Sequence, residues 1–170
     1  SRGLVFGGLH VYHGAIQHTR PREARARAVR DGPVAAATRV VADLAAAGIQ
    51  VPQVTGGGTG TLLQDLENPT HTELQPGSYL VMDADYARVY EEEERLDLEQ
   101  ALFVHTSVLT AAGDKRVVDA GAKAVDLVSG APLLAPYALD GERRSVAPST
   151  AVYSSGGDEH GVLRGVAAGE

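Results

Sequence analysis

The chain contains no cysteine and no tryptophan, and it has one methionine and two phenylalanines among its 170 residues. Without cysteine, disulfides and thiolate metal sites are excluded, and the composition suits the cytoplasm. No run of about 18 apolar residues occurs, and the amino end lacks the pattern of a signal peptide, so we expect no membrane-spanning helix. A Lys/Arg-rich block is also missing and the formal charge is -7, which argues against a nucleic-acid surface.

What is present indicates a folded chain that binds small molecules. The hydrophobic content of 44% lies in the globular range, and 170 residues suffice for one domain or two small ones. The chain opens with Ser-Arg-Gly and has no initiator methionine, so we expect its start to be a cut.

A glycine-rich stretch, residues 55–61 (TGGGTGT), is the most informative local feature. It follows an apolar run that ends at Val54 and precedes a short helical turn expected over residues 62–66. Adjacent glycines let the backbone turn sharply, so successive N–H groups can point into one concavity and bind a phosphate. The same glycines also fit an ordinary turn, and this alternative stays open on the stretch alone.

Polar residues gather after the first expected strand, residues 4–12, which we predict to be buried. Tyr12 closes that strand, and His13, Gln17 and His18 lie on the loop that follows. In a barrel or an open parallel sheet, ligands bind at the carboxyl ends of strands. The histidine spacing matches no usual metal motif, so we expect a polar active-site wall here, with surface histidines as the alternative.

Residues 21–47 are rich in alanine, arginine and valine, and their apolar residues recur at helical spacing. We predict an amphipathic helix that is kinked or split at Gly32-Pro33 and stops at Gly48. We interpret its five arginines between residues 20 and 30 as a solvated helix face. A strand over residues 50–55 completes a βαβ unit, which indicates a parallel α/β fold.

The periodicity changes later in the chain. Residues 72–83 read as a short strand, a Pro-Gly turn and a second extended piece, and the acidic run 91–94 reads as a solvated segment. Three short β-type runs follow, over residues 101–109, 116–119 and 147–153. We therefore predict two domains, a partial TIM-like barrel over residues 1–98 and part of an antiparallel β domain over residues 99–170.

Five motifs together resemble the D-threonine aldolase-like enzymes, a group that includes D-serine dehydratases and 3-hydroxy-D-aspartate aldolases. The motifs are 12–18 (YHGAIQH), 56–61 (GGGTGT), 72–83 (TELQPGSYLVMD), 119–124 (DAGAKA) and 158–161 (DEHG). The resemblance runs from about residue 8 to residue 163. It implies fold-type III, as in alanine racemase: a TIM-like barrel that carries pyridoxal phosphate, joined to a β domain.

The resemblance also implies which residues face the cofactor and the substrate. The phosphate would lie on the backbone donors of Gly57, Gly58 and Thr59, with Thr55 nearby. Tyr12 and, less directly, Tyr79 would contact the cofactor. His13, Gln17 and His18 would lie on the substrate side. The implied reaction is retro-aldol cleavage of a small-molecule β-hydroxy D-amino acid to glycine and an aldehyde, with D-serine dehydratase-like chemistry as the alternative.

Two catalytic parts of this family have no match in the chain. In the family, the Schiff-base lysine precedes the position that is equivalent to Leu4. This chain has only two lysines, Lys115 and Lys123, and Lys123 matches a motif of the family's β domain. A divalent ion held by a His-x-Asp or His-x-Cys pair is expected beyond the last motif. We therefore expect an internal portion of a homodimeric enzyme, inactive alone, with neither the catalytic lysine nor a metal site. A complete, non-catalytic binder of pyridoxal phosphate or another phosphorylated ligand is the alternative from a different class.

Overall fold

The computed structural model describes residues 3–90, 97–135 and 149–166. The chain divides into two compact units, Ser1–Ala101 and Leu102–Glu170. The acidic run 91–94 lies outside the described residues, and the predicted limits of the two domains stay a prediction. No helix in the described part of the chain is long and apolar enough to cross a membrane.

The first unit contains a parallel sheet of three short strands in the order β1 (Leu9–Val11), β2 (Val54–Gly56) and β3 (Glu73–Leu74). The register aligns His10 with Thr55, and Thr55 with Glu73. Neighbouring residues of a strand point to opposite faces, so these three side chains share one face of the sheet. That face is polar, whereas Val54 on the other face is buried. The sheet therefore has a helix-covered apolar face and a polar one.

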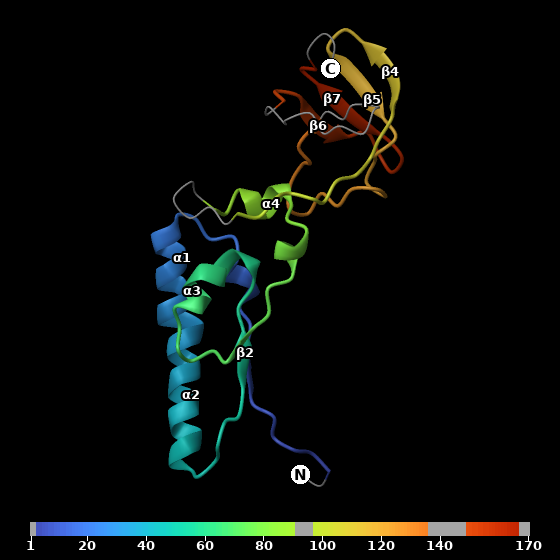
Figure 1. Ribbon diagram of the computed structural model, residues 1–170. Coiled ribbons are helices and arrows are strands. Elements are labelled where there is room, and N and C mark those ends of the chain that lie inside the picture. The colour runs from blue at the N-terminus through green and yellow to red at the C-terminus, as the bar shows by residue number, and fades with distance from the viewer. Residues whose placement is uncertain (1–2, 91–96, 136–148, 167–170) are drawn as a thin grey trace. The chain divides into compact units, whose positions relative to one another are not determined.

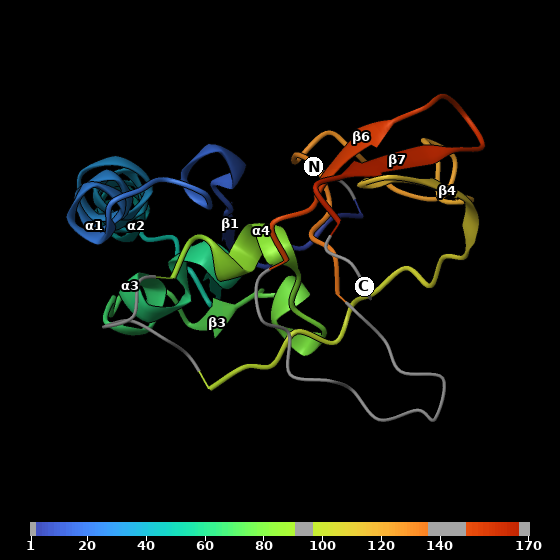
Figure 2. The same cartoon turned by 90° about the horizontal axis from the view of Figure 1, so that it is seen from above.

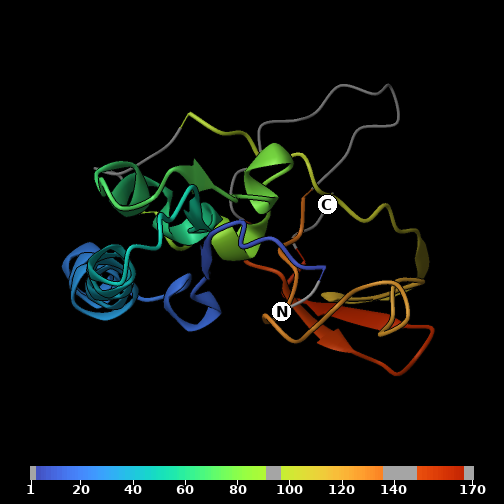
Figure 3. The same ribbon diagram turned by 90° about the horizontal axis from the view of Figure 1, so that it is seen from below.

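Two helices joined by a π-helical turn connect β1 to β2 and run alongside β2 (Figure 1). They are α1 (Arg22–Val29) and α2 (Ala35–Ala46), and the turn is Arg30–Val34. Pro33 inside this turn removes a backbone donor, which is why the helix is interrupted at the predicted place. Figures 2 and 3 look along both helices and place them on one side of the sheet.

Helix α2 ends in a glycine motif, as the sequence predicts. Gly48 has a φ of 75°, and its N–H donates to the carbonyl of Ala45 while that of Ile49 donates to Leu44. This Schellman arrangement satisfies the last carbonyls of the helix and requires a residue that tolerates positive φ. The chain then returns to β2, so the predicted parallel βαβ connection is confirmed.

Short elements surround the far end of the sheet. A 3₁₀ helix, Gly14–Ile16, follows β1, and a second, Thr59–Thr61, leads directly into α3 (Leu62–Leu66). After β3 come a 3₁₀ helix, Ser78–Leu80, and α4 (Ala84–Ala87), where the Asp83 carboxylate caps the amide of Tyr86 at 2.8 Å.

Two details of the first unit differ from the prediction. The strand expected over residues 4–12 is confined to β1, and Leu4 and Val5 are exposed because no described element packs on them. The prediction of a second extended piece before Asp83 is also wrong, because Ser78–Leu80 is a 3₁₀ helix. There the amides of Leu80 and Val81 donate to Gly77 and Ser78, and these local hydrogen bonds replace a strand partner.

The second unit is an antiparallel sheet, as predicted, with the order β4–β5–β7–β6, and all four strands are labelled in Figure 1. The strands are β4 (Val108–Ala112), β5 (Lys115–Val118), β6 (Val152–Ser155) and β7 (Gly161–Arg164). Its core contains Val118, Ala120, Tyr153, Leu163 and Val166. Strand β7, four residues at the centre of the sheet, was not predicted, because so short a run has no alternation strong enough to separate it from a loop.

The last two sequence motifs pack against each other in this unit. The amides of Ala122 and Lys123 donate to the carbonyls of Gly157 and Asp158, and the Tyr153 hydroxyl donates to Ala120 at 2.8 Å. A Cβ on Gly161 would collide with the Tyr153 ring, so only glycine fits there. Hydrogen bonds from the Ser107 amide and the Thr106 hydroxyl lower the pKa of Asp119. These contacts hold the two motifs together within the second unit.

Candidate functional site

The glycine turn continues β2 beyond the carboxyl edge of the parallel sheet. Gly57 has a φ of 72°, a conformation that favours glycine. Within the described part of the chain, the N–H groups of Gly57, Gly58 and Thr59 donate no hydrogen bond. All three residues are buried, and a buried N–H without an acceptor is unfavourable. The turn therefore presents three consecutive donors that suit an anion such as the phosphate of pyridoxal phosphate.

Thr59 is held by contacts with residues that follow it in the chain. Its hydroxyl accepts a hydrogen bond of 3.1 Å from the Tyr79 amide, and its carbonyl accepts one from the Tyr90 hydroxyl. Tyr79, predicted to contact the cofactor, thus reaches the turn through its backbone. The 3₁₀ helix that contains Tyr79 fixes the position of the turn.

Gln17 supports the turn from the other side. It is 1% exposed, its Oε1 accepts from the Gly60 amide at 2.9 Å, and its Nε2 donates to the Thr61 hydroxyl at 3.0 Å. A Cβ on Gly58 would lie 2.5 Å from Gln17 Oε1, so glycine is needed for this close approach. The sequence predicted Gln17 on the substrate side, whereas the structure directs its amide into the turn.

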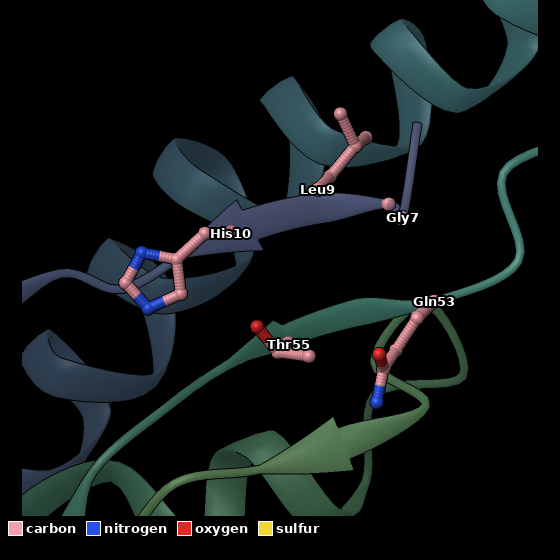
Figure 4. Close-up of a pocket in the computed structure, with 6 residues that line it drawn as sticks. Gly7, Leu9, His10, Gln53 and Thr55 are labelled. Atoms are coloured by element: carbon pink, nitrogen blue, oxygen red, sulfur yellow. The ribbon is translucent and has the colours of Figure 1, made fainter. Parts of the chain in front are cut away.

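An open cavity of about 240 Å³ lies along the polar face of β1 and β2 rather than at the glycine turn itself (Figure 4). It is lined by Gly7, Gly8, Leu9, His10, Gln53 and Thr55. Thr55 thus faces open space on the same strand that leads into the turn. His10 is fixed at the cavity by a 2.8 Å hydrogen bond between its Nε2 and Gln75 Oε1. A ligand whose phosphate lay at the turn would extend toward this polar face.

Tyr12 and His18 are accessible side chains on the loop after β1. The Tyr12 ring is nearly parallel to that of His10, with centroids 6.3 Å apart. The imidazole of His18 lies 3.4 Å from the Asp85 carboxylate and packs against the Tyr86 ring. Burial raises the pKa of Tyr86, and the Tyr12 phenol and nearby aspartates add to that rise. Tyr86 is therefore a neutral phenol at physiological pH, and the sequence analysis had not singled it out.

His13 turns away from the open face and joins a buried cluster behind the glycine turn. Its Nε2 lies 3.5 Å from Asp65 Oδ1, and His71 Nδ1 lies 3.8 Å from the same oxygen. Burial lowers the pKa of His71, an effect that Asp65 opposes and His13 reinforces. The sequence analysis identified neither Asp65 nor His71. The four-residue spacing of Thr61 and Asp65 across the start of α3 is the signal that points to their contact.

Arg25 corrects the interpretation of the arginine cluster as a solvated face. It is 0% exposed, and its guanidinium donates to the carbonyls of Thr19 and Val89 and lies over the Tyr90 ring. Arg30, in contrast, is exposed and pairs with Asp31. Backbone carbonyls at chain turns can accept hydrogen bonds from a buried guanidinium, and both of these bonds come from Nη1 of Arg25. Arg25 thereby ties the start of α1 to the segment after α4.

The described residues contain no group of three His, Cys, Asp or Glu side chains that could hold a metal ion. Lys123, the better matched of the two lysines, is on the surface, where its Nζ pairs with the carboxylates of Glu159 and Asp158. An ammonium held in this way is no free nucleophile. The described residues therefore suit the phosphate of pyridoxal phosphate and its surroundings, but not the covalent attachment of that cofactor.

No family model matches the chain. Curated relatives do match it. The chain is 39% identical over 167 residues to a D-threonine aldolase of Arthrobacter sp, a match that covers 95% of the chain and 40% of the relative. It is also 39% identical over 165 residues to the 3-hydroxy-D-aspartate aldolase of Paracoccus denitrificans strain Pd 1222. This match covers 94% of the chain and 40% of the relative. The chain thus spans about two fifths of the length of these relatives.

Solved structures agree. The D-threonine aldolase from Filomicrobium marinum superposes with a TM-score of 0.77 at 36% identity over 95% of this chain and 40% of that one. The D-threo-3-hydroxyaspartate dehydratase from Delftia sp. HT23 superposes with a TM-score of 0.68 at 25% identity, over 93% of this chain and 42% of that one. An alanine racemase-like protein from Idiomarina loihiensis, at 18% identity and a TM-score of 0.64 over 93% and 43%, shares the fold. The chain is therefore homologous to about two fifths of a D-threonine aldolase-like protein of the alanine racemase-like fold, which confirms the family that its five motifs indicate.

Proposed function

We propose that this chain contributes the phosphate seat of pyridoxal phosphate in a lyase that cleaves β-hydroxy D-amino acids to glycine and an aldehyde. The buried glycine turn carries the proposal, because three consecutive N–H groups there lack acceptors among the described residues. Phosphate oxygens are strong acceptors that fit such a nest of amides. The two relatives at 39% identity, both named as aldolases, support the reaction class.

Each predicted site residue has a definite place in this proposal. Gly57, Gly58 and Thr59 donate their amides to the phosphate, and Thr55 lines the cavity beside it. Tyr12, exposed on the polar face, provides an aromatic wall for the cofactor ring. When bound, pyridoxal phosphate supplies an electron sink for cleavage at Cα. The protein's part is to hold the phosphate so that the ring lies over the polar face of the sheet.

His18 and Tyr86 are the described side chains best placed to contact the substrate. The His18 ring is 44% exposed and fixed by Asp85, and Tyr86 packs against it with a hydroxyl that stays protonated at neutral pH. A hydroxyl or carboxylate of an amino acid can hydrogen-bond to both groups. We assign Gln17 and His13, which are buried, to the support of the glycine turn.

Dehydration is the second candidate reaction, favoured by the structural similarity to a D-threo-3-hydroxyaspartate dehydratase. Product analysis of the enzyme that contains this chain, with D-threonine as substrate, separates the two reactions. Retro-aldol cleavage yields glycine and acetaldehyde, whereas dehydration yields ammonia and a 2-oxo acid. A binder that is not an enzyme gives neither product. Glycine with an equal amount of acetaldehyde is the result that we expect.

Phosphate-dependent binding tests the cofactor assignment on the chain itself. We choose pyridoxine 5′-phosphate and pyridoxine as ligands, because neither has an aldehyde that could react with Lys115 or Lys123. In equilibrium dialysis, the phosphorylated ligand should bind at least roughly tenfold more tightly, since its charge-assisted hydrogen bonds are absent from pyridoxine. Gly58→Ala should abolish this difference, whereas Gly32→Ala, where a Cβ meets nothing within 4 Å, should keep it. Equal retention of both ligands by the unaltered chain would overturn the assignment.

Three further features implied by the family belong to the same proposal. They are a homodimeric assembly, a divalent ion held by residues other than those described here, and a cytoplasmic location. A small-molecule D-amino acid as substrate and no nucleic-acid partner also follow from the family and from the formal charge of -7.

A further inference from the structure

A buried carboxylate lies directly beneath the proposed phosphate seat. Asp65, on α3, has a fully buried side chain, and a Cβ on Gly57 would lie 2.6 Å from its Oδ2. A negative charge at this place opposes the binding of a phosphate to the amides of the same turn. It also requires a partner of its own, because an unpaired carboxylate in the protein interior is strongly unfavourable.

A chain of hydrogen bonds ends at Asp65, which accepts the last of them. The Gly60 amide donates to Gln17 Oε1, which fixes the orientation of the Gln17 amide. Gln17 Nε2 therefore donates to Thr61 Oγ1. The hydroxyl hydrogen of Thr61 is left to donate to Asp65 Oδ2 at 2.5 Å, the length of a hydrogen bond to a charged acceptor. This chain of donors suits an ionised Asp65.

His71 does not provide the compensating proton. The Thr70 amide donates to Asn68 Oδ1 at 3.0 Å, so Asn68 Nδ2 is the atom that faces His71 Nδ1, also at 3.0 Å. Nδ1 must then accept, and the ring proton of His71 lies on Nε2. Burial, which lowers the pKa of His71, favours the same neutral form.

His13 is the remaining group next to the free oxygen of Asp65. Its side chain is 7% exposed, its Nε2 lies 3.5 Å from Asp65 Oδ1, and neither ring nitrogen has a hydrogen-bond partner among the described residues. The other groups that face it are His71, the Tyr12 phenol beside it in the chain and, from α1, Arg25, whose guanidinium is engaged by the Thr19 and Val89 carbonyls.

We propose that His13 is an imidazolium paired with Asp65, and that this buried pair neutralises the charge beneath the glycine turn so that the turn can hold a phosphate. This inference rests on the proposed function of the turn as a phosphate seat. His13 and Asp65 are positioning residues, because they act on the phosphate through the turn and not by contact.

The protonation state can be measured without any ligand. Imidazole ¹⁵N chemical shifts distinguish an imidazolium from each neutral tautomer, and His13→Gln and His71→Gln assign the two signals. We expect His13 to carry two protons at neutral pH and His71 one, on Nε2. Asp65→Asn should remove the imidazolium signal of His13. A neutral His13 in the unaltered chain overturns the inference, whatever the cofactor assignment.

Inorganic phosphate, titrated against the same variants, tests the link to the turn. His13→Gln should weaken its binding roughly tenfold, and the double variant Asp65→Asn/His13→Gln should restore affinity to within about threefold of the unaltered chain. A merely structural role predicts that the double variant binds worse than the single one, which would overturn the inference. His105→Gln, an exposed histidine of the second unit, is the matched control.

Absence of phosphate binding to every variant, including the unaltered chain, would instead refute the proposed phosphate seat. The histidine shifts then still decide whether the buried pair exists.

Discussion

The Gln17 side-chain amide donates a 3.0 Å hydrogen bond to the hydroxyl of Thr61, and the two residues are 44 positions apart in the chain. This contact joins the loop after β1 to the turn after β2, at the carboxyl edge of the parallel sheet. Because the same side chain also accepts from the Gly60 N–H, one buried residue holds the last two residues of the short 3₁₀ helix that leads into α3. The geometry of the turn thus depends on a residue outside it.

Replacement of Gln17 by alanine should destabilise the first unit. The Gly60 amide would lose its buried acceptor, at a cost of about 1–3 kcal/mol, while the Thr61 hydroxyl would lose one partner and keep its hydrogen bond to Asp65. Urea unfolding followed by the helical circular dichroism signal measures this, because α1 to α4 all lie in the first unit. Gln50→Ala, an exposed position before β2, is the control and should change the unfolding free energy by less than about 0.5 kcal/mol.

Gly58→Ala should displace Gln17 and loosen the turn, because the added methyl group would lie 2.5 Å from Gln17 Oε1. We expect a loss of about 1–3 kcal/mol in the same unfolding experiment, typical of overpacking. Gly32→Ala in the π-helical turn should be neutral or stabilise the protein by up to about 1 kcal/mol, since alanine restricts the unfolded chain. If the two variants are equally stable, a methyl group fits at position 58, and the close contact with Gln17 in the structure is wrong.

Arg25→Met should be strongly destabilising, although the sequence places this residue among surface arginines. The substitution leaves the Thr19 and Val89 carbonyls without their buried donor, and hydrogen bonds that involve a charged group contribute about 1.5–3 kcal/mol each. Arg27→Met, two residues further on the exposed side of α1, should have little effect. If both variants unfold at the same urea concentration, the buried position of Arg25 is wrong.

The first unit should lose stability when the pH falls below about 6.5, the ordinary pKa of histidine. Burial lowers the pKa of His71, so the unfolded chain binds the proton more readily than the folded one. The stabilisation due to neutral His71 is complete above the unfolded pKa and is lost as the pH drops toward the lowered value. His71→Asn should flatten this part of the curve of unfolding free energy against pH, while His105→Gln should not.

The sequence predicts the parts of the fold that depend on local chemistry. The helix interruption at Pro33, the glycine stop at Gly48 and the helical turn Leu62–Leu66 follow from backbone preferences that operate over a few residues. The parallel pairing of β1 with β2 follows from the handedness of the βαβ connection. Strand β7 was missed because its four residues carry no alternation strong enough to separate it from a loop.

The buried polar residues could not be predicted in the same way. His13, Asp65 and His71 come from three segments, and only the packed turn brings them together. Arg25 resembles its neighbours in sequence, and its burial depends on carbonyls at Thr19 and Val89. The glycine run itself located the turn. The family resemblance assigned Gln17 and His13 to the substrate side, whereas adjacent residues in a motif need not share a direction.

The central claim is that the amides of Gly57, Gly58 and Thr59 hold the phosphate of the cofactor, and amide NMR tests it most directly. In a ¹H–¹⁵N titration with pyridoxine 5′-phosphate, these three amide protons should move downfield together, as expected when N–H groups acquire charged acceptors. Pyridoxine, which lacks the phosphate, should leave them in place. Shifts of equal size with both ligands, or shifts confined to other residues, would contradict the account.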